Sequence, residues 1–177
     1  MLCNLYKITL RCYSLAAFSL LFSAPAISEE PLSKEQKLKA AYLLNFTKFI
    51  EWPILSEDES IPTINICVAA TPKFSQFLSQ LVSDRRVGRL QSKVSVIPYL
   101  NASNCKLLYI QGKQKFNLAQ SKNTVIVADV DNSLSTETAI MFYTENRKLR
   151  FEINLEKIKQ LQVKVSSELL KLARIKR

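Results

Sequence analysis

Apolar residues recur every three to four positions between Ser33 and Ile50, which is the spacing of a helix with one buried face. Gln36 follows Ser33 by three positions, and this pair is the signature of a capping box. Pro53 ends the pattern, because proline cannot continue the hydrogen bonds of a helix. We therefore predict a mostly buried helix from Ser33 to about Ile50. Its predicted inward stripe consists of Leu38, Tyr42, Phe46 and Phe49, with Leu43 and Ile50 beside it.

Short segments with apolar residues at every second position follow, and this period is typical of strands. We predict such strands at residues 63–69, 93–98 and 106–110. The continuous apolar run 125–128 suits a strand that is covered on both faces. Between these strands, one short helix begins at Pro72 and a weaker helix covers residues 113–120.

The end of the chain has a different pattern. Residues 139–143 and 148–153 alternate and are joined by a polar link, which predicts an antiparallel hairpin. Asn154 then caps a helix, with Ile153 and Ile158 placed as the hydrophobic staple around the cap. A last helix begins at Ser166 or Ser167, and its predicted inward residues are Leu169, Leu172 and Ala173.

These elements together predict the fold class. Helices interleaved with buried strands are typical of an α/β protein. We expect a single domain built on a mixed sheet of about five to six strands, flanked by helices on both faces and ending in a C-terminal antiparallel hairpin.

The N-terminal segment 1–28 has the pattern of a secretory signal peptide, so we expect an exported protein whose mature domain is 29–177. Lys7 and Arg11 form a basic start, and a short apolar core precedes the small residues before the expected cleavage site at Ala26 or Ser28. A membrane anchor is the alternative, but it needs about 20 apolar residues, and this segment has fewer.

Composition narrows the class of protein. Because residues 1–28 contain two basic residues and no acidic one, 23 basic and 15 acidic side chains remain in the mature chain. A basic exported protein meets acidic proteins, anionic lipid or cell-wall polymer, and we expect no nucleic-acid partner. The sequence has no histidine and two glycines, which argues against histidine-dependent nucleophilic sites, most catalytic zinc sites and phosphate-binding glycine loops. We expect no enzymatic activity, no metal and no cofactor.

Two cysteines, Cys67 and Cys105, remain after the signal peptide. In an oxidising compartment an even count is most simply a disulfide. Cys67 lies inside its predicted strand and Cys105 lies just before its own, so a bridge requires their Cα atoms to come within about 7 Å. A redox-sensing thiol pair is the alternative.

Acidic residues near strand ends are candidate ligand groups. Asp129 and Asp131 follow the apolar run, and ligands bind at the carboxyl ends of strands in open α/β sheets. Acids at such positions also cap turns. Glu152 lies on the strand face opposite Phe151 and, if buried, needs Arg150 or an external ligand as partner.

Further candidate binding residues lie in the C-terminal segment. The cluster between Lys171 and Arg177, which includes Arg174, could attract an acidic partner, or it could complement the C-terminus of the last helix. Asn154 and Ile158 are candidate contact residues beside Glu152, with capping and stapling as their structural alternatives.

Three segments resemble the YfiR family of exported regulatory proteins: KAAYLLNFTKFIEWP from Lys39 to Pro53, INICVAA from Ile64 to Ala70, and the stretch from Leu149 to Ile175. The resemblance covers nearly all of the mature chain. The family pairs one cysteine in the first strand with one before a Leu-Leu-Tyr-Ile strand, and these positions match Cys67 and Cys105. The second cysteine pair that some members have near the hairpin is missing here.

The resemblance implies a periplasmic repressor that binds the periplasmic sensor region of an inner-membrane diguanylate cyclase, and so lowers cyclic di-GMP and biofilm formation. A homodimer and a small-molecule effector are further partners to be considered. The alternative function is a periplasmic small-molecule binding module that feeds a sensor kinase or an outer-membrane receptor. The two differ in structure, because a repressor should expose an apolar patch and a binding module should enclose a polar pocket near Asp129 or Glu152.

Overall fold

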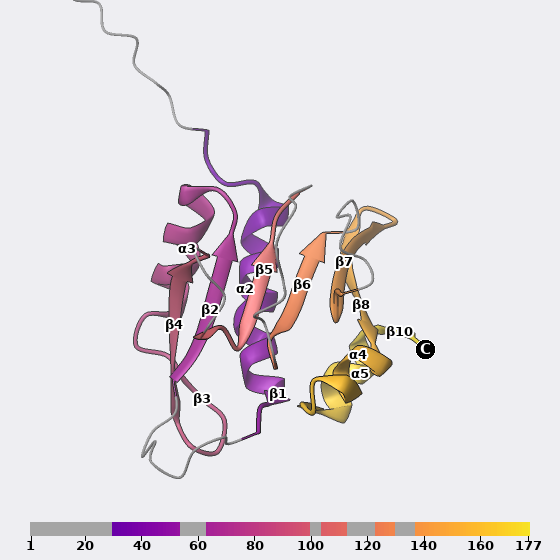
Figure 1. Cartoon of the computed structure of the whole chain (residues 1–177). Helices are drawn as coiled ribbons and strands as arrows, with labels where there is room; N and C mark the ends of the chain where they lie inside the picture. Colours follow the sequence, from indigo (N-terminus) through magenta and orange to yellow (C-terminus); the bar gives the residue numbers. More distant parts are fainter. Residues whose placement is uncertain (1–29, 54–62, 100–103, 113–122, 130–136) are drawn as a thin grey trace, which may run out of the picture. The chain divides into compact units, whose positions relative to one another are not determined.

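The computed structural model describes residues 30–53, 63–99, 104–112, 123–129 and 137–177 (Figure 1). The chain divides into two units, Met1–Pro31 and Leu32–Arg177, and the fold described below is that of the second. The predicted signal peptide, the predicted helix at residues 113–120 and the candidate residue Asp131 lie outside the described residues. Within the described ranges no helix is both long and apolar enough to cross a membrane.

A mixed sheet of eight strands forms the centre of the second unit. Its strands follow the order β10 (Arg174–Lys176), β8 (Lys148–Asn154), β7 (Ile140–Glu145), β6 (Val125–Asp129), β5 (Leu107–Ile110), β2 (Thr63–Ala69), β4 (Ser92–Pro98) and β3 (Arg86–Val87). Strands β4, β2, β5, β6 and β7 are parallel to one another, whereas β8 is antiparallel to β7 and β3 to β4. The predicted α/β class and the C-terminal hairpin are confirmed.

Two short edge strands enlarge the sheet beyond the six strands that alternation predicts. Strand β3 has two residues and β10 has three, so neither is long enough to show a period of two. A second, two-stranded sheet pairs β1 (Ile50–Glu51) with β9 (Lys164–Val165). This small sheet joins the chain just after the first helix to the segment that precedes the last helix.

Four helices contribute to a single apolar cluster on one face of the sheet. They are α2 (Lys34–Phe49), α3 (Pro72–Val82), α4 (Leu155–Gln160) and α5 (Ser167–Leu172). Figure 1 shows α2 and α3 side by side behind the strands. The predicted capping box is present, since Gln36 N donates to Ser33 Oγ at 3.2 Å and Ser33 N donates to Gln36 Oε1 at 2.9 Å.

The opposite face of the sheet carries a smaller buried cluster that contains the disulfide. Cys67 in β2 is bonded to Cys105, which lies two residues before β5, and their Cα atoms are 5.6 Å apart. The buried Thr124 hydroxyl donates a 2.7 Å hydrogen bond to the Cys105 carbonyl. The predicted bridge is therefore confirmed, and it ties two neighbouring parallel strands together.

Candidate functional site

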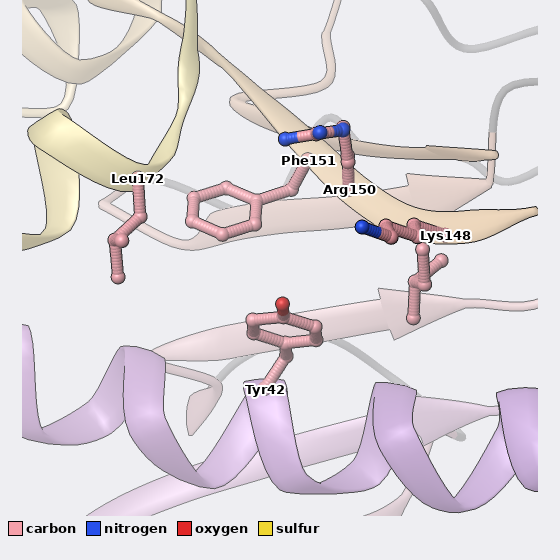
Figure 2. Close-up of a pocket in the computed structure, with 6 residues that line it drawn as sticks. Tyr42, Lys148, Arg150, Phe151 and Leu172 are labelled. Carbon is pink, nitrogen blue, oxygen red and sulfur yellow. The ribbon is translucent and has the colours of Figure 1, made fainter. Parts of the chain in front are cut away.

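An open groove lies between α2, β8 and α5 (Figure 2). It has a volume of about 350 Å³ and is lined by Tyr42, Lys148, Leu149, Arg150, Phe151 and Leu172. Figure 2 shows Tyr42 rising from α2 toward Phe151 of β8, with Leu172 of α5 to one side. The groove thus joins three segments that are far apart in the sequence.

Aromatic packing forms the floor of the groove. The ring centroid of Tyr42 lies 5.3 Å from that of Phe151 and 5.9 Å from that of Phe142. Phe46, one helical turn after Tyr42, lies 5.2 Å from Phe151 and is fully buried. Because three of these four rings are buried in the core, the half-buried Tyr42 is held in a fixed position at the mouth.

Two exposed leucines lie on the helices that border the groove, and one of them, Leu172, lines it. Leu172 is 68% exposed and Leu38, one turn before Tyr42 on α2, is 45% exposed. The prediction that both point inward is wrong. At α2 it is Lys39 that is turned toward the sheet instead of Leu38. At α5 only Leu169 reaches the core, because the helix ends at Leu172 and the chain continues into β10.

Two cations of β8 stand at the groove. Arg150 forms an exposed ion pair with Glu145, with its Nε 3.2 Å from Glu145 Oε2. Lys148 has no ion pair with any residue that the structure describes. The groove therefore combines aromatic and aliphatic walls with positive charge, which suits an apolar group that carries a nearby negative charge.

Glu152 and Arg174, both predicted as binding residues, meet on the other face of β8. Arg174 Nε lies 2.7 Å from Glu152 Oε2, and the guanidinium carbon lies 4.0 Å from the centre of the Tyr143 ring. The hydrogen bond to Glu152 raises the pKa of Arg174. The Glu152 side chain is only 16% exposed, and its partner is neither Arg150 nor an external ligand but a residue of the neighbouring strand β10.

A family model described as YfiR/HmsC-like matches residues 36–174. The chain belongs to the YfiR/HmsC-like family. The match begins in the first turn of α2 and ends at the first residue of β10, so the groove and the Glu152–Arg174 pair lie inside the family domain. A comparison with curated proteins gave no match.

Family membership makes this chain a regulatory protein of the cyclic di-GMP pathway, and the family is periplasmic rather than known for catalysis. The described part of the chain holds no group of three or more His, Cys, Asp or Glu side chains placed to bind a metal ion. For a regulator, the surfaces that partners can reach matter most, and the groove is such a surface.

Other predicted site residues of this YfiR/HmsC-like domain have structural roles. The Asn154 side chain accepts a 3.1 Å hydrogen bond from Lys157 N and so caps α4. Ile158 is buried in the main core. Lys171 is exposed on α5, next to Leu172 in sequence, and it does not contact Glu152.

Asp129 is held by a lysine that the sequence analysis did not single out. Lys39 Nζ lies 2.9 Å from Asp129 Oδ1 and 2.8 Å from Glu35 Oε1. Burial lowers the pKa of Lys39, but hydrogen bonds to Glu35 and Asp129 outweigh burial, and the net direction is upward. The inward position of Lys39 could have been predicted from its helical spacing with Leu43, Phe46 and Ile50, which are buried. This spacing puts the lysine on the inner face of α2.

Tyr109 of β5 lies beneath this ion pair and is fully buried. Burial raises the pKa of Tyr109, and the Asp129 carboxylate raises it further. The Tyr109 hydroxyl is buried, and the carboxylate that acts on it is the one whose Oδ1 lies 2.9 Å from Lys39 Nζ. Asp129 therefore faces a lysine and a phenol inside the protein, an arrangement that fastens α2 to the sheet.

Proposed function

We propose that this protein represses an inner-membrane diguanylate cyclase by binding its periplasmic sensor region through the groove between α2, β8 and α5. Repression lowers cyclic di-GMP and biofilm formation. Membership of the YfiR/HmsC-like family supports a role in this pathway.

The exposed leucines at the groove are the observation that carries the proposal. Leu172 lines the groove together with the half-buried Tyr42, and Leu38 is exposed on α2 one helical turn before Tyr42. Covering a leucine side chain is favourable by about 1.5–3 kcal/mol. A partner that covers both leucines would gain this free energy, and contiguous exposed apolar surface is typical of protein-binding sites.

The alternative, a small-molecule binding module, calls for an enclosed pocket with convergent polar groups near Asp129 or Glu152. Both carboxylates are instead paired internally, with Lys39 and Arg174. The groove itself is lined by apolar and aromatic side chains, with its cations at the edge. This arrangement favours a protein partner over an enclosed ligand.

The chemistry of the groove also specifies the contact on the partner. An apolar side chain of the sensor region would enter between Tyr42 and Leu172, and an acidic side chain beside it would reach Lys148. Such a pairing of apolar burial with a charge at the rim is common in protein interfaces.

Site-specific cross-linking tests this proposal directly. A photoreactive amino acid at Leu172 should cross-link, in the native host, to a membrane protein that mass spectrometry identifies as a diguanylate cyclase. The matched control places it at Ile175, which is exposed on β10 but does not line the groove. Cross-linking at Ile175 but not at Leu172, or at neither position, would count against the groove.

A further inference from the structure

The hairpin formed by β3 and β4 lies at the edge of the main sheet (Figure 1), and its two strands are joined by a tight turn. Gly88 and Gln91 take positive φ values of 71° and 51°. The backbone N and the side-chain Nε2 of Gln91 both donate to the Gly88 carbonyl at 3.3 Å. Two hydrogen bonds from Gln91 therefore close the turn, and Arg89 and Leu90 are exposed to solvent.

Cations surround the tip. Arg85, Arg86, Arg89 and Lys93 are all exposed, and Asp84 is the single acidic residue between residues 83 and 93. In the described parts of the chain, none of the four cations forms an ion pair. We call these four residues, together with Leu90, the basic tip.

The charges of the basic tip work against local stability. Arg86 stands directly opposite Lys93 in the antiparallel pairing of β3 and β4. Like charges that face each other across two strands are destabilising. The Arg86 guanidinium is partly fixed by a 3.3 Å hydrogen bond from Nη1 to the Gln91 carbonyl, but no carboxylate of a described residue neutralises either cation. A negatively charged surface that meets this hairpin would be attracted by both cations.

The exposed side chain of Leu90 indicates which kind of anionic partner suits the basic tip. It is 51% exposed at the turn of the hairpin, between cations on both sides in sequence. An exposed apolar side chain flanked in the sequence by arginine and lysine matches a membrane interface, where apolar groups enter the acyl boundary and cations meet the phosphates. We propose that the basic tip binds the surface of membranes that contain anionic phospholipids.

This contact is separate from the groove, because no residue of the basic tip lines it. It would raise the concentration of an exported regulator at the membrane surface whichever membrane protein it regulates. The inference thus stands independently of the proposed repression.

Vesicle co-sedimentation is the test. Because Leu32–Arg177 forms a compact unit of its own, the protein lacking residues 1–28 is suitable. It should sediment with vesicles of mixed phosphatidylcholine and phosphatidylglycerol, and not with phosphatidylcholine alone. Binding should weaken as salt is added. Failure to sediment with the anionic vesicles at low salt would overturn the proposal. This holds also if the basic tip is then found to bind an acidic protein.

Charge-matched variants separate the basic tip from overall charge. R89Q/K93Q should weaken vesicle binding about 25-fold, since each cation near an anionic surface contributes about fivefold. The control K159Q/K171Q removes the same charge from exposed residues of the C-terminal segment and should weaken binding about twofold at most. Equal losses in the two variants would show unspecific attraction and would contradict the proposal. Unchanged thermal unfolding of each variant shows that the fold is retained.

A fluorescent label at position 90 reports whether this part of the basic tip enters the membrane. Because Cys67 and Cys105 are bonded to each other, L90C offers one thiol for an environment-sensitive dye in the protein lacking residues 1–28. Its emission should shift to the blue on anionic vesicles, whereas the same dye at L38C, also an exposed leucine, should not shift. An unshifted dye at L90C would contradict insertion. Competition by inorganic phosphate as effective as that by vesicles would assign the site to free phosphate instead.

Discussion

At the scale of single residues, Lys39 shows how one charge inside an apolar stripe orients a whole helix. Its ammonium group bridges Glu35 of the same helix and Asp129 at the end of β6. The buried face of the helix is centred between Lys39 and Ala40, in line with Leu43, and at about 100° per residue Leu38 falls on the far side of that face. The buried ion pair and the exposure of Leu38 are therefore two consequences of one helix orientation.

Replacing Lys39 by methionine should lower the free energy of unfolding by about 2 kcal/mol, because Asp129 would lose its cationic partner in a mostly buried site. K37M is the matched control, since Lys37 is an exposed residue of the same helix, and it should change stability little. Urea unfolding measures both. Equal stability of K39M and the unaltered protein would show that the Lys39–Asp129 pair does not hold α2 in place.

Alkaline pH should destabilise the protein through the same cluster. The pKa of Lys39 is raised above its ordinary 10.5, so its contribution is complete below that pH and is lost as pH rises through the folded-state pKa. The pKa of Tyr109 is raised above its ordinary 10.0, so unfolded chains release that proton first. Both effects make the free energy of unfolding fall above about pH 10.

The variant Y109F isolates one of these two contributions. At neutral pH it should be about as stable as the unaltered protein, because the phenol is uncharged there and its removal leaves the Lys39–Asp129 ion pair in place. Above about pH 10 its stability should fall less steeply. Urea unfolding across this pH range measures the difference, and identical slopes for the two proteins would contradict the assigned role of Tyr109.

At the scale of elements, the long patterned segments could be predicted from the sequence and the short ones could not. The helix that starts after Ser33 and the strand of residues 125–128 carry enough residues to show their periods. Strand β10 has three exposed residues and pairs with β8, where Arg174 also contacts Glu152, 22 positions earlier in the sequence. Contacts at such separations depend on topology, so the cluster of Glu152, Arg174 and Tyr143 was not predictable as a unit.

Strand β10 should depend on that pairing. R174Q removes the ion pair with Glu152 and the contact with the Tyr143 ring, so amide hydrogens of β10 should exchange faster with solvent. K176Q is the matched control on the same strand, since Lys176 makes no ion pair with a described residue. Equally fast exchange in the two variants would show that the strand is held by its backbone alone.

The disulfide acts between elements, because it links the interior of β2 to the residue that leads into β5. Its loop of 38 residues implies a stabilisation of about 4 kcal/mol in the chain-entropy description. The double variant C67A/C105A should lose about that amount in urea unfolding. Two reactive thiols in the denatured, unreduced protein would refute the bridge itself.

At the scale of the whole molecule, the unit Leu32–Arg177 combines a buried apolar core with an open groove, whose walls are apolar and aromatic with two cations at the edge. The candidate site was only partly predictable: the sequence singled out Glu152 and Arg174, whereas Leu38 and Leu172 were assigned to the core. Helical spacing identifies apolar residues but does not show whether a neighbouring element covers them. Leu172, for which the inward prediction failed, is the exposed leucine that lines the groove, and Leu38 is exposed on the neighbouring helix α2.

Cellular cyclic di-GMP is the measurement that tests the central claim most directly. Deleting the gene in its native host should raise cyclic di-GMP, and the full chain should reverse the rise. The form lacking residues 2–28 should not, if this segment directs export as the sequence predicts. L172N should restore repression poorly and I175N should restore it fully. An unchanged cyclic di-GMP level after deletion would contradict repression of a cyclase by this protein.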